Sequence, residues 1–271
     1  MIPATFDYEV AESVDHAIEL LGSRGDAKLL AGGHSLLPLM KLRFARPELL
    51  VDIGRLPELA YVREDGDRIA IGALTRHHDV ATNELLQGAN PLVAETAAGI
   101  GDPQVRHRGT IGGSVAHGDP AADFPAVLVA LDAELVARGP GGERTIAAGD
   151  FFRGYFETAL GPQDVLTEIR LPKSEGAYLK FHRRQQDWAT VGVAAVRSNG
   201  SARIALTNMG ATPVRAHGVE EALSSGADPA TAAARAADGT SPPSDTAASA
   251  EYRGHLAQVL TRRALERVMS G

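Results

Sequence analysis

The chain has 271 residues, long enough for two modest domains or for one large domain with a small addition. It contains no cysteine, so this chain alone forms no disulfide and no thiolate zinc site, and holds no iron–sulfur cluster by thiolates. The formal charge of −7, the dispersed basic residues and an aromatic content of 5% argue against nucleic acid as a ligand, and no apolar run is long enough to span a membrane. The first residues have neither the basic nor the apolar segment of a secretory signal, and we expect a cytoplasmic protein.

The first fifty residues alternate between helical and strand patterns. Residues 14–21 carry apolar side chains at the i, i+3, i+4 and i+7 positions behind Ser13, which predicts a capped amphipathic helix. Short apolar runs predict strands at 28–30 and 49–53, and residues 36–43 have helical character. The predicted order is therefore helix, strand, helix and strand.

The middle of the chain mixes strand and helix patterns separated by turn formers. We expect Thr75 to cap a helix and Asp102-Pro103 to break the chain. The predicted elements are strands at 68–72 and 165–171, helices at 75–83, 91–100 and 124–131, and a hairpin made of 134–137 and 144–146.

The last third is expected to form a small domain of its own. Residues 172–176 are polar and rich in turn formers, as at a domain boundary. Beyond them, apolar runs at 178–181, 191–196 and 202–209 have the spacing of an antiparallel meander, and the pattern at 251–269 predicts a final helix. These elements indicate an antiparallel sheet with helices.

Two glycine pairs have the chemistry of a phosphate site. They lie in Ala31-Gly32-Gly33-His34-Ser35 and Thr110-Ile111-Gly112-Gly113-Ser114, each between a strand-like run and a small hydroxyl residue. Glycines let backbone N–H groups close around a phosphate without a Cβ in the way. A single pair marks an ordinary turn as often as a ligand site, but two such pairs suggest that both grip one pyrophosphate. The spacings of a P-loop and of a Rossmann fingerprint are absent.

The same segments resemble a known family. The stretches A-G-G-H-S-L-L-P from Ala31, T-I-G-G-S from Thr110 and D-P-A-A-D from Asp119 are similar to the FAD-binding medium subunits of molybdenum hydroxylases of the carbon monoxide dehydrogenase type. Those subunits are similar to the flavin domain of xanthine dehydrogenase. The resemblance covers essentially the whole chain, including residues 187–192 and 248–253.

The resemblance implies an α+β fold. It predicts a vanillyl-alcohol-oxidase-type (PCMH) FAD-binding domain of two α+β subdomains, with FAD between them, followed by a small C-terminal α+β domain. We expect the boundaries at 1–55 for the first subdomain, 56–173 for the second and 177–271 for the C-terminal domain.

The resemblance also implies site residues. Residues 31–35 and 110–114 would take the pyrophosphate, and Asp123 would lie near the ribityl chain and the phosphates. Ile100 would pack against the isoalloxazine, and Leu166 would make a backbone contact. His182 matches a position that is often Lys in the family; a histidine titrates near neutrality where a lysine keeps a fixed charge, and a plain surface histidine is an equal alternative.

What the family implies for function is an FAD-binding electron-transfer subunit, part of an oxidoreductase. Molybdopterin would reside on a large partner subunit and [2Fe-2S] clusters on a small one, in a dimer of heterotrimers. No catalytic residue and no metal ligand are then expected in this chain, because the cofactor carries the chemistry. A self-contained flavin oxidase or reductase of the same fold, and a non-catalytic scaffold subunit, stay open as alternatives. The substrate (carbon monoxide, an N-heterocycle, a purine or an aldehyde) and the acceptor (NAD, quinone or oxygen) are left open.

Three histidines and the tryptophan are further candidates for a role in a site. His77 and His78 are adjacent on a predicted helix, so their side chains diverge and a shared metal ion is disfavoured. His117 follows the second glycine pair, where approach to the cofactor and a packing role are equally expected. Trp188, the only tryptophan, is more often a core residue than a ligand contact, although the resemblance places its loop toward the flavin edge.

Overall fold

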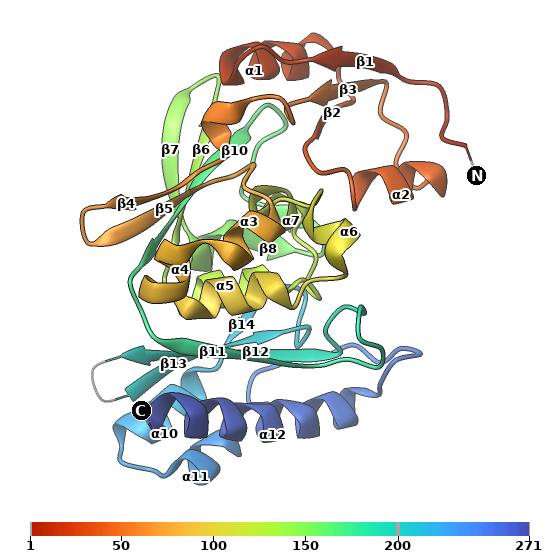
Figure 1. Ribbon diagram of the computed structural model, residues 1–271. Helices are drawn as coiled ribbons and strands as arrows, with labels where there is room; N and C mark the ends of the chain where they lie inside the picture. Colours follow the sequence, from red (N-terminus) through yellow and green to blue (C-terminus); the bar gives the residue numbers. More distant parts are fainter. Residues whose placement is uncertain (1, 199–200, 271) are drawn as a thin grey trace.

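The computed structural model describes residues 2–198 and 201–270 (Figure 1). Three larger sheets follow one another along the chain, with helices between and outside them and one short two-stranded sheet besides. Within the described residues, no helix combines the length and the apolar character needed to cross a membrane. This layered mixture of helices and sheets agrees with the predicted α+β class.

The first sheet is small and parallel, in the order β1-β3-β2. Its strands and helices are β1 (Asp7–Val10), α1 (Val14–Ser23), β2 (Ala27–Leu30), α2 (Leu36–Lys41) and β3 (Leu49–Asp52). The Ser13 hydroxyl accepts the His16 N–H at 3.1 Å, which confirms the predicted cap of α1. The apolar stripe of α1 packs on the sheet, so this layer has a core of its own.

The second sheet has five antiparallel strands in the order β4-β5-β10-β6-β7. The predicted strands and the hairpin are confirmed, and β4 is a further strand that the sequence patterns did not predict. The elements are β4 (Val62–Asp65), β5 (Arg68–Gly72), β6 (Glu134–Gly139), β7 (Gly142–Ala147) and β10 (Val165–Pro172), with the short pieces η1 (Pro57–Leu59), α9 (Ala148–Phe151), β8 (Phe152–Gly154) and β9 (Glu157–Thr158).

Six helices accompany this sheet between β5 and β6. They are α3 (His77–Thr82), α4 (Glu84–Ala89), α5 (Pro91–Ala98), α6 (Pro103–Arg106), α7 (Ile111–His117) and α8 (Asp123–Ala130). Side chains of α5 and α8 share one buried cluster with β5, β6 and β10 and with the inner face of the third sheet. The helices therefore form the layer between the second and third sheets (Figure 1).

One prediction in this region is wrong. Thr75 does not cap a helix: its hydroxyl lies 2.7 Å from the Gly72 carbonyl oxygen and accepts the Tyr61 N–H at 3.1 Å, and α3 begins only at His77. Asp102 is extended between α5 and α6, as the predicted break requires, and its carboxylate also accepts the Val105 N–H at 2.9 Å and so caps α6, a helix that was not predicted. In both cases a polar side chain found a nearby backbone partner that the local pattern did not distinguish.

The third sheet is the predicted meander, in the order β11-β12-β13-β14. Its strands are β11 (Gly176–Phe181), β12 (Val191–Ser198), β13 (Ser201–Thr207) and β14 (Val214–Arg215), followed by α10 (His217–Ser224), α11 (Pro229–Ala233) and α12 (Ala250–Met269). In β12, Val191 and Val193 face the cluster that contains α12, whereas Ala194 and Val196 face the helix layer. Because both faces are covered, the strand is apolar without alternation.

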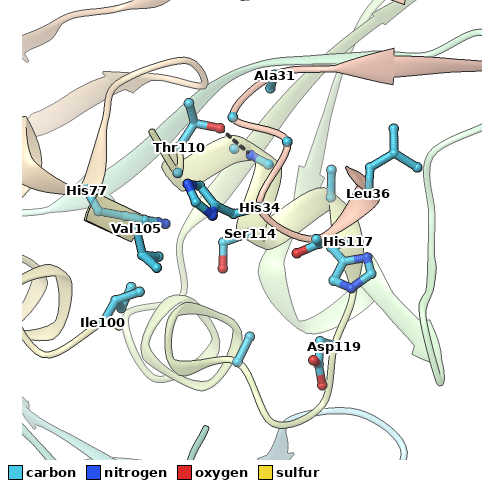
Figure 2. Close-up of a pocket in the computed structure, with 18 of the residues that line it drawn as sticks. Ala31, His34, Leu36, His77, Ile100, Val105, Thr110, Ser114, His117 and Asp119 are labelled. Carbon is cyan, nitrogen blue, oxygen red and sulfur yellow. Dashed lines mark hydrogen bonds between the residues drawn. The ribbon is translucent and has the colours of Figure 1, made fainter. Parts of the chain in front are cut away.

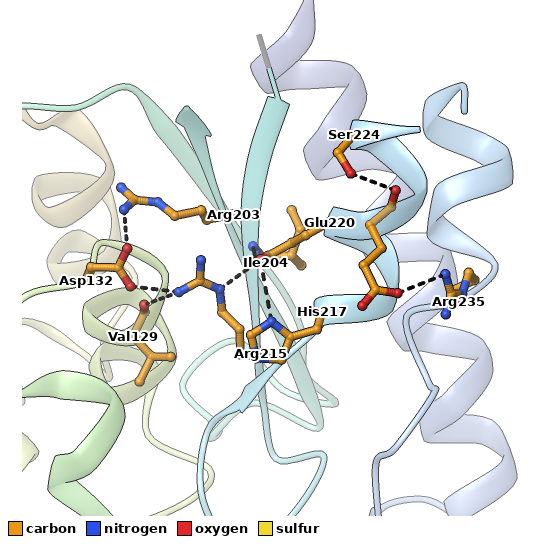
Figure 3. A network of polar contacts seen from close by, with 10 residues as sticks. Val129, Asp132, Arg203, Ile204, Arg215, His217, Glu220, Ser224 and Arg235 are labelled. Carbon is orange, nitrogen blue, oxygen red and sulfur yellow. Dashed lines mark hydrogen bonds and ion pairs between the residues drawn. The ribbon is translucent and has the colours of Figure 1, made fainter. Parts of the chain in front are cut away.

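An ion-pair network joins the helix layer to this sheet (Figure 3). Asp132, just after α8, pairs with Arg203 of β13 and, at 2.7 Å, with Arg215 of β14. Arg215 also pairs with Glu220 of α10 at 2.5 Å, and the same carboxylate accepts the Ile204 N–H at 2.8 Å. The network fixes the position of the third sheet against α8.

A buried arginine anchors α12. Arg253 is 1% exposed, and its guanidinium donates to the Thr190 carbonyl and, at 2.7 Å, to the Asp245 carboxylate. It thereby ties the helix to the start of β12 and to the loop that precedes the helix.

We expect Arg253→Ala to lower the free energy of unfolding by about 3 kcal/mol, because it opens a cavity and leaves the Thr190 carbonyl without its donor. The matched control is Arg262→Ala on the same helix, whose half-exposed side chain lies 3.7 Å from Glu266 and contributes about 0.5 kcal/mol or less. Urea unfolding of both variants measures the difference. Equal losses in the two variants would contradict an anchoring role for Arg253.

Candidate functional site

A cavity of about 610 Å³ lies between the first sheet, the helix layer and the edge of the third sheet. Its volume is in the range of small-molecule and cofactor sites, roughly 300 to 1,000 Å³. Twelve of the fourteen residues predicted for the site line it: Ala31, Gly32, Gly33, His34, Ser35, Ile100, Thr110, Gly112, Gly113, Ser114, Asp123 and Leu166. The fold therefore collects into one cavity residues that are far apart in the sequence.

Two of the predicted residues lie outside the lining. Ile111 is fully buried in the hydrophobic core at the first position of α7. The His182 ring nitrogen Nδ1 lies 2.5 Å from the Arg184 carbonyl oxygen, whereas Lys180, two residues earlier on β11, lines the cavity. The cofactor roles of Ile111 and His182 stay predictions.

The first glycine pair forms a turn with unused donors. Gly33 has a φ of +79°, in the left-handed region that favours glycine. A Cβ on Gly32 would lie 2.4 Å from the Arg108 carbonyl oxygen, so the turn touches the segment before the second pair. Within residues 2–198 and 201–270, the N–H groups of residues 32–35 have no hydrogen-bond acceptor. These donors are available to an anion in the cavity.

The second glycine pair is not a loop but the start of α7 (Figure 2). The Thr110 hydroxyl accepts the Gly113 N–H at 3.1 Å, and the N–H groups of Ile111 and Gly112 donate to the carbonyls of Thr75 and Ala73 at 3.0 and 2.9 Å. These three N–H groups therefore already have protein acceptors, and the phosphate role of residues 110–114 stays a prediction. A Cβ on Gly112 would lie 2.4 Å from the Ala73 Cβ, so here the glycine serves close packing.

In residues 110–114, the Ser114 side chain is the polar group that can still bind an anion in the cavity. It lies on the cavity side of α7, and its hydroxyl has no hydrogen-bond partner among the described residues. The donors for an anion thus come from the backbone of the first turn and from a side chain of α7.

A buried carboxylate forms part of the cavity wall next to the third sheet. Asp123, the first residue of α8, accepts the Tyr178 hydroxyl at 2.7 Å and the Lys180 ammonium at 2.9 Å. Lys180 also donates to the Gly99 carbonyl at 3.0 Å. Burial raises the pKa of the Asp123 carboxyl, and the contacts of Lys180 and Tyr178 counteract that effect. Sequence reasoning missed Lys180 and Tyr178, although strand alternation places both on the same face of β11.

The two adjacent histidines diverge as predicted. His77 lines the cavity and is 4% exposed, whereas the ring of His78 lies 4.1 Å from the ring of His107, and neither of these two lines the cavity. Burial, together with the positive charges of His34, Arg76 and Arg106, lowers the pKa of His77 to about 4. His77 is therefore uncharged at neutral pH.

The remaining two candidates also line the cavity. His117 packs against Phe156 with ring centroids 5.0 Å apart, and burial lowers its pKa. Trp188 is 69% exposed at the rim, so it is not a core residue.

We expect Gly32→Ala to destabilise the chain by about 1 to 3 kcal/mol, because the new methyl group must push the first turn away from the Arg108 carbonyl. Gly25→Ala is the control, since a Cβ there has no atom within 4 Å. Thermal or urea unfolding measures both variants. A stability of Gly32→Ala equal to that of wild type would show that the close approach is dispensable.

The pKa of His77 makes stability depend on pH. The pKa of His77 is 6.5 in the unfolded chain and about 4 in the folded chain. Between pH 6.5 and pH 4 the imidazole is therefore protonated in the unfolded chain and neutral in the folded chain. Stability then decreases as the pH drops from 6.5 to 4, by up to roughly 3 kcal/mol. We expect His77→Phe to remove this part of the decrease in urea unfolding measured across that range. Parallel curves for wild type and variant would contradict the assignment.

Comparison with known proteins agrees with this geometry. Residues 4–174 match the family described as the FAD binding domain in molybdopterin dehydrogenase, and residues 176–268 match the CO dehydrogenase flavoprotein C-terminal domain. The chain is 46% identical to the carbon monoxide dehydrogenase medium chain of Hydrogenophaga pseudoflava, over 98% of this chain and 97% of the relative. It is 40% identical to the 6-hydroxypseudooxynicotine dehydrogenase complex subunit alpha of Paenarthrobacter nicotinovorans, over 99% and 96%.

A solved structure of carbon monoxide dehydrogenase from Hydrogenophaga pseudoflava superposes with a TM-score of 0.96 and 45% identity, over 100% of this chain and 99% of that chain. The cavity fits a flavin dinucleotide, since unused N–H donors at one wall suit its phosphates and apolar side chains such as Ile100 and Leu166 suit its ring. The chain belongs to the family of FAD-binding medium subunits of molybdenum hydroxylases, which includes carbon monoxide dehydrogenase and xanthine dehydrogenase, and it is a flavoprotein subunit of an oxidoreductase.

Proposed function

We propose that this chain is the electron-transfer subunit of a heterotrimeric molybdenum hydroxylase. Electrons from iron–sulfur clusters of a small partner would pass through its FAD to an external acceptor. The observation that carries the proposal is the cavity itself, where unused donors of the first turn, the free hydroxyl of Ser114 and an apolar wall meet. FAD, when bound, supplies the redox chemistry, and the chain has to bind it, orient it and exclude water.

The first turn would hold the pyrophosphate. Each hydrogen bond from a neutral donor to a charged phosphate oxygen contributes about 1.5 to 3 kcal/mol. The N–H groups of residues 32–35 together with the Ser114 hydroxyl suffice for such a grip without a basic clamp. The start of α7 adds the positive end of its dipole, although its first N–H groups already have protein acceptors.

The far end of the cavity would orient the flavin ring. Ile100 and Leu166 offer apolar surface there, and Leu166 is 5% exposed. Asp123 is held by Tyr178 and Lys180, so its carboxylate has a fixed position and would lie beside the ribityl chain. The roles of Ile100 and Asp123 follow the resemblance, which for Leu166 implies a backbone contact, and the common location of the three residues in one lining supports them.

The partners are proposed from the relatives and from the composition. The relatives carry names such as medium chain, FAD-subunit and complex subunit alpha, which describe parts of assemblies. This chain has no cysteine for an iron–sulfur cluster. We therefore propose a small iron–sulfur subunit, a large subunit that holds molybdopterin, and a dimer of such heterotrimers.

The division of the chain is proposed in the same way. The parallel sheet lies within residues 1–55, the five-stranded sheet and the short β8-β9 pair lie within 56–173, and the meander lies within 177–271 except for Gly176, the first residue of β11. The cavity lies where these three units meet, so FAD would bridge them.

The test is purification of the chain together with its partner subunits, with one FAD per chain as the expected content. Ser114→Asp places a negative charge where the phosphates would bind, and like charges in contact cost several kcal/mol, so FAD content should fall at least about tenfold. Ser241→Asp, on an exposed loop, is the control and should keep full content.

Two results would overturn the proposal. One is a complex that lacks FAD and still transfers electrons to its acceptor. The other is substrate turnover by this chain purified alone, which would favour the self-contained oxidase or reductase.

A further inference from the structure

One buried polar group at the cavity has no partner. Among the described residues, four buried side-chain atoms lack a hydrogen bond: Nδ1 of His77, Nε of Arg203, Nε of Arg253 and the hydroxyl of Thr261. Only His77 of these lines the large cavity. Nδ1 itself is closed off by protein, so a ligand in the cavity cannot reach it. The second ring nitrogen, Nε2, is not among these closed-off atoms and has no hydrogen-bond partner within the described residues, so it is the nitrogen that is open to the cavity.

The ring of His77 is held firmly in place. It stacks on Phe124 with centroids 5.6 Å apart and an interplanar angle of 22°, and its backbone N–H donates to the Gly109 carbonyl at 3.0 Å. A Cβ on Gly109 would lie 2.8 Å from the ring Cδ2, so glycine at that position makes room for the imidazole. Figure 2 shows the ring extending from the cavity wall with a nitrogen at its tip. The orientation of the ring is therefore fixed before any ligand binds.

The place and the charge of His77 restrict its ligand. The side chain lies between Thr110, next to the glycine pairs, and Ile100, on the apolar side (Figure 2). An uncharged imidazole has one N–H donor and one acceptor. A hydroxyl group can accept a hydrogen bond from the N–H or donate one to the unprotonated nitrogen, so it suits either tautomer of the imidazole. A flavin dinucleotide has hydroxyl groups on the ribityl chain, between the phosphates and the flavin ring, and on the ribose of its adenosine, beyond the phosphates; a position between the glycine pairs and the apolar side of the cavity corresponds to the ribityl chain.

We propose that His77 is a positioning residue that hydrogen-bonds a ribityl hydroxyl of the bound FAD. The inference rests on the proposed function of the cavity and adds to it a contact that the glycine motifs do not contain. This role differs from that of a histidine in the core, whose ring nitrogens would both have protein partners.

The test compares His77→Phe, which keeps a ring against Phe124 but removes both nitrogens, with His77→Gln, which restores a donor and an acceptor. His78→Phe, on the same helix and outside the lining, is the matched control. The complex is stripped of FAD and then titrated with FAD, followed by flavin fluorescence and absorbance. We expect the FAD dissociation constant to rise about tenfold in His77→Phe, to be partly restored in His77→Gln, and to be unchanged in His78→Phe.

A second arm locates the contact within the ligand. With an FAD analogue that has a deoxy ribityl chain, the difference in affinity between wild type and His77→Phe should vanish, because the partner group is missing. A difference of the same size with the analogue and with FAD would refute the ribityl contact.

The melting temperature of the FAD-free complex distinguishes positioning from packing. We expect it to be equal or higher in His77→Phe, since an unsatisfied polar group is removed. A marked fall would assign His77 to packing and overturn the inference. Equal FAD affinity and equal flavin spectra in wild type and His77→Phe would overturn it as well, while leaving the proposed function intact. A wild-type complex that takes up no FAD would instead refute the proposed function.

Discussion

The cavity depends on one close approach between two backbones, that of Gly32 to the carbonyl oxygen of Arg108 and to Gly109. The same segment is held from the other side, since Arg76 donates to the Arg108 carbonyl and the His77 N–H donates to the Gly109 carbonyl. The first parallel sheet and the helix layer are thereby joined at the position where both glycine pairs lie. A side chain at residue 32 would separate them.

The two glycine pairs look alike in the sequence and act differently. In the first turn the glycines leave N–H groups free. In α7, Gly112 lets the helix lie directly on Ala73 and donates its N–H to the Ala73 carbonyl, and the Gly113 N–H donates to the Thr110 hydroxyl. Binding of an anion would thus rest on the backbone of one segment and on the Ser114 side chain of the other. The third sheet adds the Asp123, Tyr178 and Lys180 cluster, kept in position by the Asp132 ion pairs.

Local patterns predicted most elements because they report burial directly. The stripe of α1, the hairpin of β6 and β7 and the meander of β11 to β13 follow from periodicity and from turn residues. The contacts of Thr75 with Gly72 and Tyr61 and the cap at Asp102 could not be predicted, since the partner of a short polar side chain depends on which carbonyl or N–H the fold brings within about 3 Å. Strand β4 was missed because a sequence of charged residues at a sheet edge lacks an apolar signal.

From its local patterns the sequence determined most helices and strands and the two glycine motifs, because periodicity and turn residues are local properties of the chain; its resemblance to known subunits predicted the family, the α+β class and most of the residues that line the cavity. Only the tertiary structure decided which of those residues have free hydrogen-bonding groups. The Gly112 N–H is occupied because the fold places the Ala73 carbonyl beside it. The Nδ1 of His77 is unpaired because, among the described residues, the fold places no hydrogen-bond partner beside it. Such pairings join segments distant in sequence, so no pattern within one segment contains them.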